Sequence, residues 1–416
     1  MRITSVIVVG MCGLLLASPR GSAQDAHLGM VTTWETILGA LEEKGLEVDP
    51  ASASDAFIEA IARSIDPQSR LVGTEEIKEE QLRESGTSPG FGLRVSITNG
   101  TPVIHLISAN SPAEARGLAV GDQLMSLDGT PLTDLPLPVV TRLLRQASTQ
   151  EVDLVYRTTT EAGLQTQTVT LARSPVPHYS LETAEALPGG IGYVLMNGMY
   201  TDAGKDTVMR LREWSETGSA GLILDLRGAG GADPDAAMSI AALFCPGGSL
   251  VYTVRDRNDQ DLLVQRCDQT SPLRIPAILL IDRYTHGLAE ALAGALKDAS
   301  SGVLLLGETT SGDLGLREFV TLPAGQTLRI ATRKLVTVSG TTYDGTAGVI
   351  PDIHIPSEPA ILSDYDPEPV MGRRAVLTEE WEDRSLRQRT RGDQVLQRAV
   401  DILLGMRALN LSGEQE

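Results

Sequence analysis

The chain has 416 residues, which is enough for two or three domains that each bury a core of their own. Its 42% hydrophobic and 21% charged residues give the composition of an ordinary soluble globular protein. The formal net charge of −19 repels phosphate backbones and anionic lipid headgroups, so we expect no nucleic-acid or membrane-surface partner.

The first 23 residues have the build of a secretory signal peptide. Arg2 precedes an apolar run over residues 6–17, and small residues at 21–23 lead to Gln24, which predicts cleavage after Ala23. We therefore expect the mature protein to be secreted or periplasmic. Cleavage removes two of the 35 basic side chains and none of the 54 acidic ones, so the mature chain carries a net charge of −21.

A stable membrane anchor is not expected at this end of the chain. The apolar run is too short to span a bilayer. Met11 stands before Cys12, where a lipoprotein signal has a small residue, so we expect Cys12 to leave with the signal peptide.

The remaining cysteines and the histidines limit which disulfides and metal sites the chain can form. Cys245 and Cys267 are the two cysteines of the mature chain, and in an oxidising compartment they predict a single disulfide. The five histidines are scattered, and no pair of them has the spacing of metal ligands. The sequence therefore predicts no metal site and no cofactor.

The periodicity of apolar residues divides the mature chain into regions. Residues 24–85 show helical spacing, with Gly45 and Pro50 separating two helices of a small N-terminal unit. Residues 86–174 change to the alternating pattern of strands. In this second region we expect strands at 93–97, 102–107 and 152–157 and short helices at 111–116 and 138–146.

From residue 175 to residue 357, strands and helices alternate, which predicts an α/β domain. The expected strands are 190–195, 221–226, 277–282 and 303–307, and the expected helices are 202–216, 235–244 and 288–299. A two-strand excursion is expected at 250–254 and 262–265, between the two cysteines. Residues 358–416 are expected to form an extended connector followed by an amphipathic helix over 394–409.

Three stretches, taken together and in order, resemble the carboxyl-terminal-processing peptidases, also called tail-specific proteases. Residues 64–71 read Ser-Ile-Asp-Pro-Gln-Ser-Arg-Leu, similar to the family's Leu-Asp-Pro-His-Ser motif. Residues 221–231 end in Arg-Gly-Ala-Gly-Gly, like its strand-to-glycine-loop signature, and residues 340–353 end in Gly-Val-Ile-Pro-Asp-Ile, like its closing motif. The resemblance implies a multidomain fold: a helical unit, a PDZ-like β domain, and a crotonase-like α/β domain built from ββα repeats.

The expected PDZ-like domain has a motif with a physical function of its own. Gly90, Phe91, Gly92 and Leu93 begin a strand, where glycines let successive amides converge on a peptide carboxylate and the strand edge can pair with the peptide. A Gly-Phe-Gly sequence alone is often an ordinary hairpin start. We expect the bound tail to be apolar, because the loop holds no basic side chain before Arg94.

The catalytic segment departs from the family pattern. In these peptidases a serine attacks the peptide carbonyl, a buried neutral lysine takes its proton, and backbone amides hold the oxyanion. Here Gly287 stands at the nucleophile position when the segment is aligned on Glu290, and Asp313 stands at the base position when it is aligned on residues 307–310. Glycine has no attacking atom, and aspartate cannot replace a neutral amine.

Other residues of the segment have weaker claims to a catalytic role. Ser311 is the least implausible substitute nucleophile. Thr285 is expected to be the N-cap of a helix, and Lys297 lies roughly 16–18 Å further along that helix, too far to activate it. Gly230 and Gly231 are either a remnant of the oxyanion loop or a strand-to-helix turn that needs positive φ, and both interpretations can hold. Asp225 and Arg227 are expected to form a structural ion pair.

Three functions remain open. The leading hypothesis is a catalytically inactive homologue that binds protein C-terminal tails or unstructured peptides. The first alternative is an active serine-type endopeptidase with a non-standard nucleophile, because function follows the site and not the fold. The second is a partner subunit that modulates an active paralogous peptidase.

Overall fold

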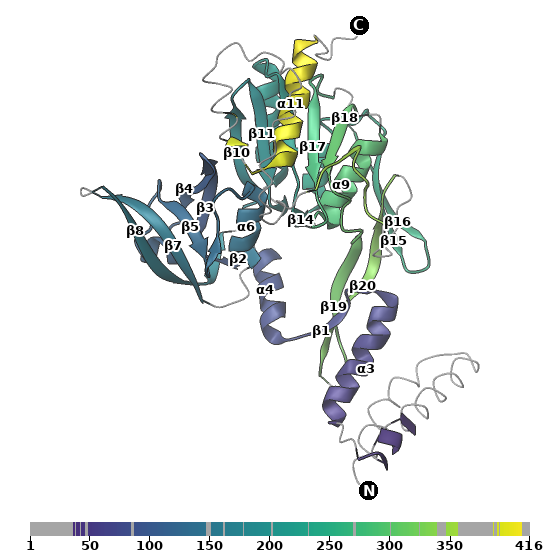
Figure 1. The fold of residues 1–416 in the computed structure, drawn as a ribbon. Helices are drawn as coiled ribbons and strands as arrows, with labels where there is room; N and C mark the ends of the chain where they lie inside the picture. Colours follow the sequence, from purple (N-terminus) through teal and green to yellow (C-terminus); the bar gives the residue numbers. More distant parts are fainter. Residues whose placement is uncertain are drawn as a thin grey trace. The chain divides into compact units, whose positions relative to one another are not determined.

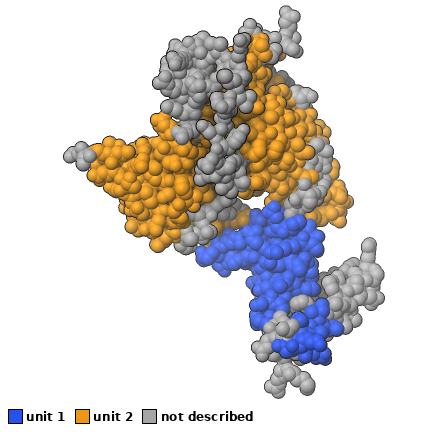
Figure 2. Space-filling view, viewed as in Figure 1, with its two compact units in different colours: residues 1–77, 317–332 blue, residues 78–316, 333–416 orange. Residues whose placement is uncertain are grey.

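The computed structural model describes residues 49–409 with gaps at 85–86, 147–150, 161–162, 178, 201–202, 232, 269–271, 300, 324, 339–346, 357–385, 387–388 and 391, and parts of residues 36–45. The predicted signal peptide and most of the predicted connector lie outside the described residues. The chain divides into two compact units: Met1–Ile77 with Arg317–Thr332, and Lys78–Leu316 with Arg333–Glu416 (Figure 2). The sequence did not predict that residues 317–332 group with the N-terminal residues.

The first unit is built on α3 (Pro50–Ile65), β1 (Arg70–Val72) and the first residues of β20 (Thr327–Val336). β1 pairs antiparallel with β20, with Arg70 opposite Arg329. Asp66 of the first family-like motif is fully buried. Its carboxylate accepts hydrogen bonds from the Ser69 hydroxyl at 2.9 Å, the Arg317 guanidinium at 2.9 Å and the Ala331 amide at 3.2 Å. This motif therefore joins the N-terminal residues to residues 317–332.

The second unit begins with a β domain of the expected kind (Figure 1). Its main sheet has the strand order β3-β4-β5-β7-β8, with β6 beside β5, and β2 pairs with β9 in a separate ladder. Helix α6 lines one side of the pocket described below. The bounds are β2 Thr87–Gly90, β3 Leu93–Thr98, β4 Thr101–Ile107, α5 Pro112–Ala115, β5 Gln123–Leu127, β6 Thr130–Pro131, α6 Leu137–Gln146, β7 Glu151–Thr160, β8 Gly163–Ala172 and β9 Ser174–Pro177.

The α/β part of the same unit holds a sheet with the order β10-β11-β13-β17-β18-β21. β10 is antiparallel to β11, and the other neighbours are parallel. The strands are β10 Leu181–Leu187, β11 Ile191–Met196, β13 Gly221–Asp225, β17 Ala277–Ile281, β18 Val303–Gly307 and β21 Ile353–His354. The helices are α7 Ala203–Glu216, α8 Pro234–Ala241, α9 Gly287–Asp298 and α11 Gln394–Ala408.

Helices cover both faces of this sheet, as a parallel sheet requires. Leu222 and Leu224 of β13 join the hydrophobic cluster that contains the apolar residues of α8 and α9. Ile223, whose side chain points to the opposite face, joins the cluster that contains the apolar residues of α11, the yellow helix in Figure 1. The continuous apolar runs of β13 and β17 are explained by burial on both faces. The fold class expected from the sequence is confirmed.

A hairpin of β15 (Leu250–Asp256) and β16 (Asp261–Arg266) follows α8, as expected. In the second unit β15 also pairs with the last residues of β20, with Thr253 opposite Val336. Cys245 and Cys267 flank the hairpin and are both buried, but they are free thiols in the structure. The disulfide between them stays a prediction for exported protein. Among the described residues no helix is both long and apolar enough to cross a membrane.

Candidate functional site

The glycine loop after β13 is held by close backbone approaches. Gly230 and Gly231 form β14, which pairs in parallel with β12 (Gly198–Met199). Gly231 has φ +100°, and a Cβ there would lie 2.3 Å from the Met199 carbonyl oxygen. A Cβ on Gly230 would lie 2.2 Å from Nε2 of His286. Gly231 therefore requires glycine for steric reasons, whatever the loop's chemical role, whereas a side chain at position 230 would have to displace the exposed His286 ring.

The start of α9 lies against this loop. His286 is the N-cap, although its side chain makes no capping hydrogen bond, and its amide donates to the Ala229 carbonyl at 3.0 Å. The expectation that Thr285 caps the helix is wrong. Its hydroxyl donates to the Leu226 carbonyl at 2.9 Å and accepts from the Asp282 amide, which fixes the turn before the helix instead.

Gly287 and Asp313, which the resemblance places at the nucleophile and base positions, meet through their backbones. The Gly287 amide donates to the Asp313 carbonyl at 2.9 Å. Gly287 has φ +59°, and a Cβ on it would lie 3.0 Å from the Gly231 carbonyl oxygen. The Asp313 side chain is only 7% exposed, and its carboxylate accepts from the Gly315 amide at 3.4 Å. Three segments, 230–231, 286–287 and 313, thus converge at one place.

Glu290, one turn into α9, organises the loop that carries Asp313. Its carboxyl group is fully buried and accepts from the Thr310 hydroxyl at 2.7 Å, the Gly312 amide at 2.9 Å and the Ser311 hydroxyl at 3.2 Å. Burial raises the pKa of Glu290 to about 7, although these hydrogen bonds act in the opposite direction. In the sequence, Glu290 serves only to align the segment with the family pattern. Its position as an acidic residue within the otherwise apolar face of α9 is the feature that could have indicated a buried structural role.

Ser311 also takes part in this network. Its hydroxyl donates to Glu290 and accepts from the Asp313 amide at 3.0 Å. The hydroxyl is therefore engaged on both sides, by Glu290 of α9 and by the Asp313 amide of its own loop. That arrangement is typical of a serine that shapes a turn, but it also places a carboxyl group next to the hydroxyl.

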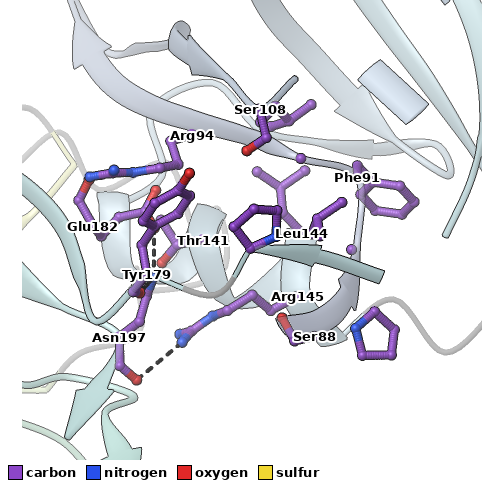
Figure 3. Close-up of a pocket in the computed structure, with 16 residues that line it drawn as sticks. Ser88, Phe91, Arg94, Ser108, Thr141, Leu144, Arg145, Tyr179, Glu182 and Asn197 are labelled. Atoms are coloured by element: carbon purple, nitrogen blue, oxygen red, sulfur yellow. Dashed lines mark hydrogen bonds between the residues drawn. The ribbon is translucent and has the colours of Figure 1, made fainter. Parts of the chain in front are cut away.

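A second candidate site is the pocket of the β domain (Figure 3). The loop over residues 88–93 forms one side, α6 contributes Thr141, Leu144 and Arg145, and residues of the α/β part close it. The Phe91 and Gly92 carbonyls accept from amides within the domain, Ala113 at 3.0 Å and Ser108 at 2.7 Å. The four residues expected to bind peptide, Gly90 to Leu93, thus all line one pocket.

The pocket is more polar than the loop sequence indicated. Arg94 donates to the Glu182 carbonyl at 3.0 Å, and its guanidinium lies over the Tyr179 ring, 5.0 Å from the centroid. Arg145 of α6 donates to the Asn197 carbonyl at 3.3 Å, and burial lowers its pKa. Figure 3 shows Arg145 reaching from the helix toward Asn197. The expectation of an apolar tail considered the loop alone and missed Arg145.

Asn197 adds an unused acceptor to the pocket. Its side-chain amide donates to the Glu182 carboxylate at 2.6 Å and to the Tyr179 carbonyl at 3.2 Å. Its Oδ1 is buried with no hydrogen-bond partner in the described part of the chain. A buried acceptor without a partner is costly, and a donor group on a bound ligand would remove that cost.

Both sites lie in regions of the chain that match known protein families. Residues 190–355 match peptidase family S41, and residues 81–157 match the PDZ domain. The chain is 28% identical, over 313 residues and 74% of each chain, to a carboxyl-terminal-processing protease of Picosynechococcus sp.. The chain is a homologue of the carboxyl-terminal-processing proteases, with a peptidase family S41 region and a PDZ region. It is also 28% identical to the chloroplastic C-terminal processing peptidase of Tetradesmus obliquus, over 76% of this chain and 72% of that protein.

Among solved structures, this carboxyl-terminal-processing peptidase homologue is similar to a photosystem II D1 C-terminal processing protease. The TM-score is 0.47 and the identity 24%, over 87% of this chain and 92% of the other. The S41 match includes the convergence of Gly231, Gly287 and Asp313, and the PDZ match includes the Gly90–Leu93 loop.

Proposed function

We propose that this protein binds protein C-terminal tails through its PDZ domain and does not itself cleave peptide bonds. The observation that carries the proposal is the backbone contact between Gly287 and Asp313 beside the glycine loop. The contact supports the alignment of both residues with the nucleophile and base positions. A glycine offers no attacking atom there, and the Asp313 side chain caps its own turn.

The test is a peptidase assay of the purified mature protein with unstructured substrates and with tail peptides. We expect no cleavage above that of a heat-denatured sample. Cleavage that is lost in Ser311→Ala, and that a mock purification does not show, would overturn the proposal.

An active enzyme that uses Ser311 is the second candidate, because one observation favours it. The Ser311 hydroxyl lies 3.2 Å from Glu290, whose pKa of about 7 suits a general base at neutral pH. Thr310 and Gly312 donate hydrogen bonds to the same carboxyl group, however, and these bonds give Glu290 a structural role without any catalysis. The peptidase assay distinguishes the two functions.

The geometry at Gly287 bears on any attempt to restore a serine there. A side chain at φ +59° costs roughly 1–2 kcal/mol, and the Cβ would also press on the Gly231 carbonyl. We expect Gly287→Ser to lower the free energy of unfolding in urea by about 2 kcal/mol. Gly218→Ser is the matched control, since Gly218 has φ +77° with open space around it, and it should cost less. An equal loss in both variants would show that the Gly231 contact has no effect.

Tail binding by the PDZ domain is tested by calorimetry on the mature chain. We expect free-acid peptides to bind at least about 10-fold more tightly than C-terminally amidated ones, because the loop amides hold the carboxylate. Gly92→Ala should abolish binding, since a Cβ there would lie 2.1 Å from Cβ of Ser111. Gly117→Ala is the control, because Gly117 also has positive φ but no atom within 4 Å of the added Cβ. Equal affinity for both peptide classes would exclude the carboxylate mechanism.

We also propose export of the protein with loss of its first 23 residues. The support is the sequence pattern before Gln24. N-terminal sequencing of protein from the periplasm or medium should begin at Gln24. A cytoplasmic protein that keeps Met1 would contradict export.

A further inference from the structure

Strand β16 leaves three consecutive apolar side chains in solvent. Leu262, Leu263 and Val264 are 54%, 46% and 43% exposed, whereas residues 251–254 of the paired strand β15 are buried. Among the described strands β16 is the last of its sheet and pairs only with β15, so its outer backbone groups form an open edge (Figure 1).

Open edges are normally protected. Proteins place lysine, proline or a very short strand at an edge, because unpaired amides and carbonyls there recruit other strands. β16 has six residues, and its middle holds neither a charge nor a proline. An edge that is both open and apolar is a surface suited to strand addition.

We propose that β16 pairs antiparallel with β16 of a second copy of this chain, giving a twofold-symmetric dimer. The sequence of the strand supports this occupant. In an antiparallel pair, residues that lie directly opposite each other point to the same face of the sheet. Because side chains alternate between faces along the strand, a twofold axis perpendicular to the sheet must then pass between the two copies of one residue. With the axis at Leu263, this residue lies opposite Leu263 of the partner subunit, and Leu262 lies opposite Val264 of the partner subunit.

This register is favoured over its neighbours. It sets every exposed apolar residue of β16 against another apolar residue, and it places Asp261 opposite Gln265 of the partner subunit, so no like charges meet. An axis at Val264 would set Leu263 against glutamine and Leu262 against arginine. An axis at Leu262 would set Leu263 against aspartate.

The dimer is expected to be weak. One added strand pair buries less area than a standard interface, which points to a dissociation constant on the order of 10 µM or weaker. The strongly negative chain repels its copy, and salt screens that repulsion. The dimer should therefore become tighter between about 20 mM and 500 mM NaCl.

Analytical ultracentrifugation of the mature chain from about 1 to 200 µM tests the proposal. We expect a concentration-dependent monomer–dimer equilibrium that Leu263→Lys weakens at least about 100-fold, because two like charges then meet at the axis. Leu164→Lys is the matched control: Leu164 is 55% exposed on β8, an edge strand of the PDZ sheet, and its substitution should leave the equilibrium unchanged.

A charge pair tests the register itself. Leu262→Lys alone should weaken the dimer, and adding Val264→Glu should restore it, because each introduced lysine then faces an introduced glutamate across the axis. A wild-type chain that stays monomeric at the highest concentration would refute the proposal. So would a dimer that survives Leu263→Lys, or a double variant no tighter than Leu262→Lys. Circular dichroism of each variant checks that these exposed substitutions leave the fold intact.

Discussion

At the scale of single residues, Glu290 makes the candidate site sensitive to pH. Burial raises the pKa of its carboxyl group from 4.5 to about 7. Between these values the folded protein holds a proton that the unfolded chain has lost, so stability falls as pH rises. The contribution of Glu290 is thus fully present below about pH 4.5 and is lost as pH rises through about 7.

We expect Glu290→Gln to remove this pH dependence. Glutamine keeps an acceptor for the 310–312 loop but does not ionise. Between pH 5 and pH 8 the wild type should lose on the order of 2 kcal/mol of unfolding free energy relative to the variant, measured by urea denaturation. Glu151→Gln, at an exposed position, is the control and should follow the wild type. Parallel profiles for wild type and Glu290→Gln would mean that Glu290 does not titrate in this range.

At the scale of elements, an ion pair joins the start of helix α11 to the residues that follow strand β13 and lead into the glycine loop. Asp393, its N-cap, accepts from the Leu396 amide at 3.0 Å and from both terminal nitrogens of Arg227 at 2.8 Å. Arg227 also pairs with Asp225 at 2.6 Å, the ion pair expected from the sequence. Burial alone would raise the pKa of Asp393, but the Arg227 guanidinium lowers it overall.

Asp393→Asn should therefore destabilise the protein through charge rather than through capping. Asparagine is a good N-cap, but the substitution leaves the buried Arg227–Asp225 cluster short of one negative charge, and removing a partner from a buried ion pair costs about 3–5 kcal/mol. Urea denaturation at pH 7 measures the loss. Asp49→Asn, at the exposed N-cap of α3, is the control and should change nothing measurable. A loss of the same size at both caps would contradict the ion-pair argument.

The β15–β16 hairpin carries the prediction of a disulfide. Cys245 and Cys267 are free in the structure, but their side chains are close enough to form a hydrogen bond. Burial raises the pKa of the Cys245 thiol to about 12, so the reduced pair should react slowly with alkylating reagents. In exported protein we expect the bond to form and to stabilise the fold by about 3 kcal/mol.

Mass spectrometry of a non-reduced digest checks this bond. The expected product is one peptide pair joined through Cys245 and Cys267, which separates on reduction. Two alkylated cysteines in protein denatured directly from an oxidising compartment would show that the bond does not form there.

At the scale of the whole molecule, the buried carboxylate of Asp66 links the two segments of the first unit. Asp66 accepts two hydrogen bonds from Arg317, each at 2.9 Å, and the arginine side chain is only 5% exposed. Asp66→Asn should remove the negative charge that faces this buried guanidinium, at a cost of about 3–5 kcal/mol. Hydrogen exchange should then speed up in residues 50–72 and 317–332 and stay unchanged in β13 and β17.

Asp55→Asn is the control for that experiment. Asp55 accepts from the Gln326 side chain at 2.9 Å in the same unit, and asparagine can still accept that bond. Protection should survive in this variant. Faster exchange in β13 after Asp66→Asn would contradict the division into two units.

Sequence patterns predicted those helices and strands that are determined by residues close together in the chain. The buried strands β13 and β17, helix α6 and the β15–β16 hairpin follow from periodicity and turn residues, which act over a few positions. The partners of Asp66 could not be predicted, because Arg317 and Ala331 are distant in sequence. Arg145 was missed as a pocket residue for the same reason, since only the folded chain brings α6 to the Gly90–Leu93 loop.

The pairing of β1 with β20 has a consequence for biosynthesis. Arg70 is made long before Arg329, its partner across the ladder, and Asp66 long before Arg317. Contacts between residues so far apart in sequence form late, because the intervening loop must close first. The amino-terminal residues therefore emerge early but cannot complete their structure until most of the chain has been translated. During that interval the edge of β1 that later pairs with β20 is open to other strands.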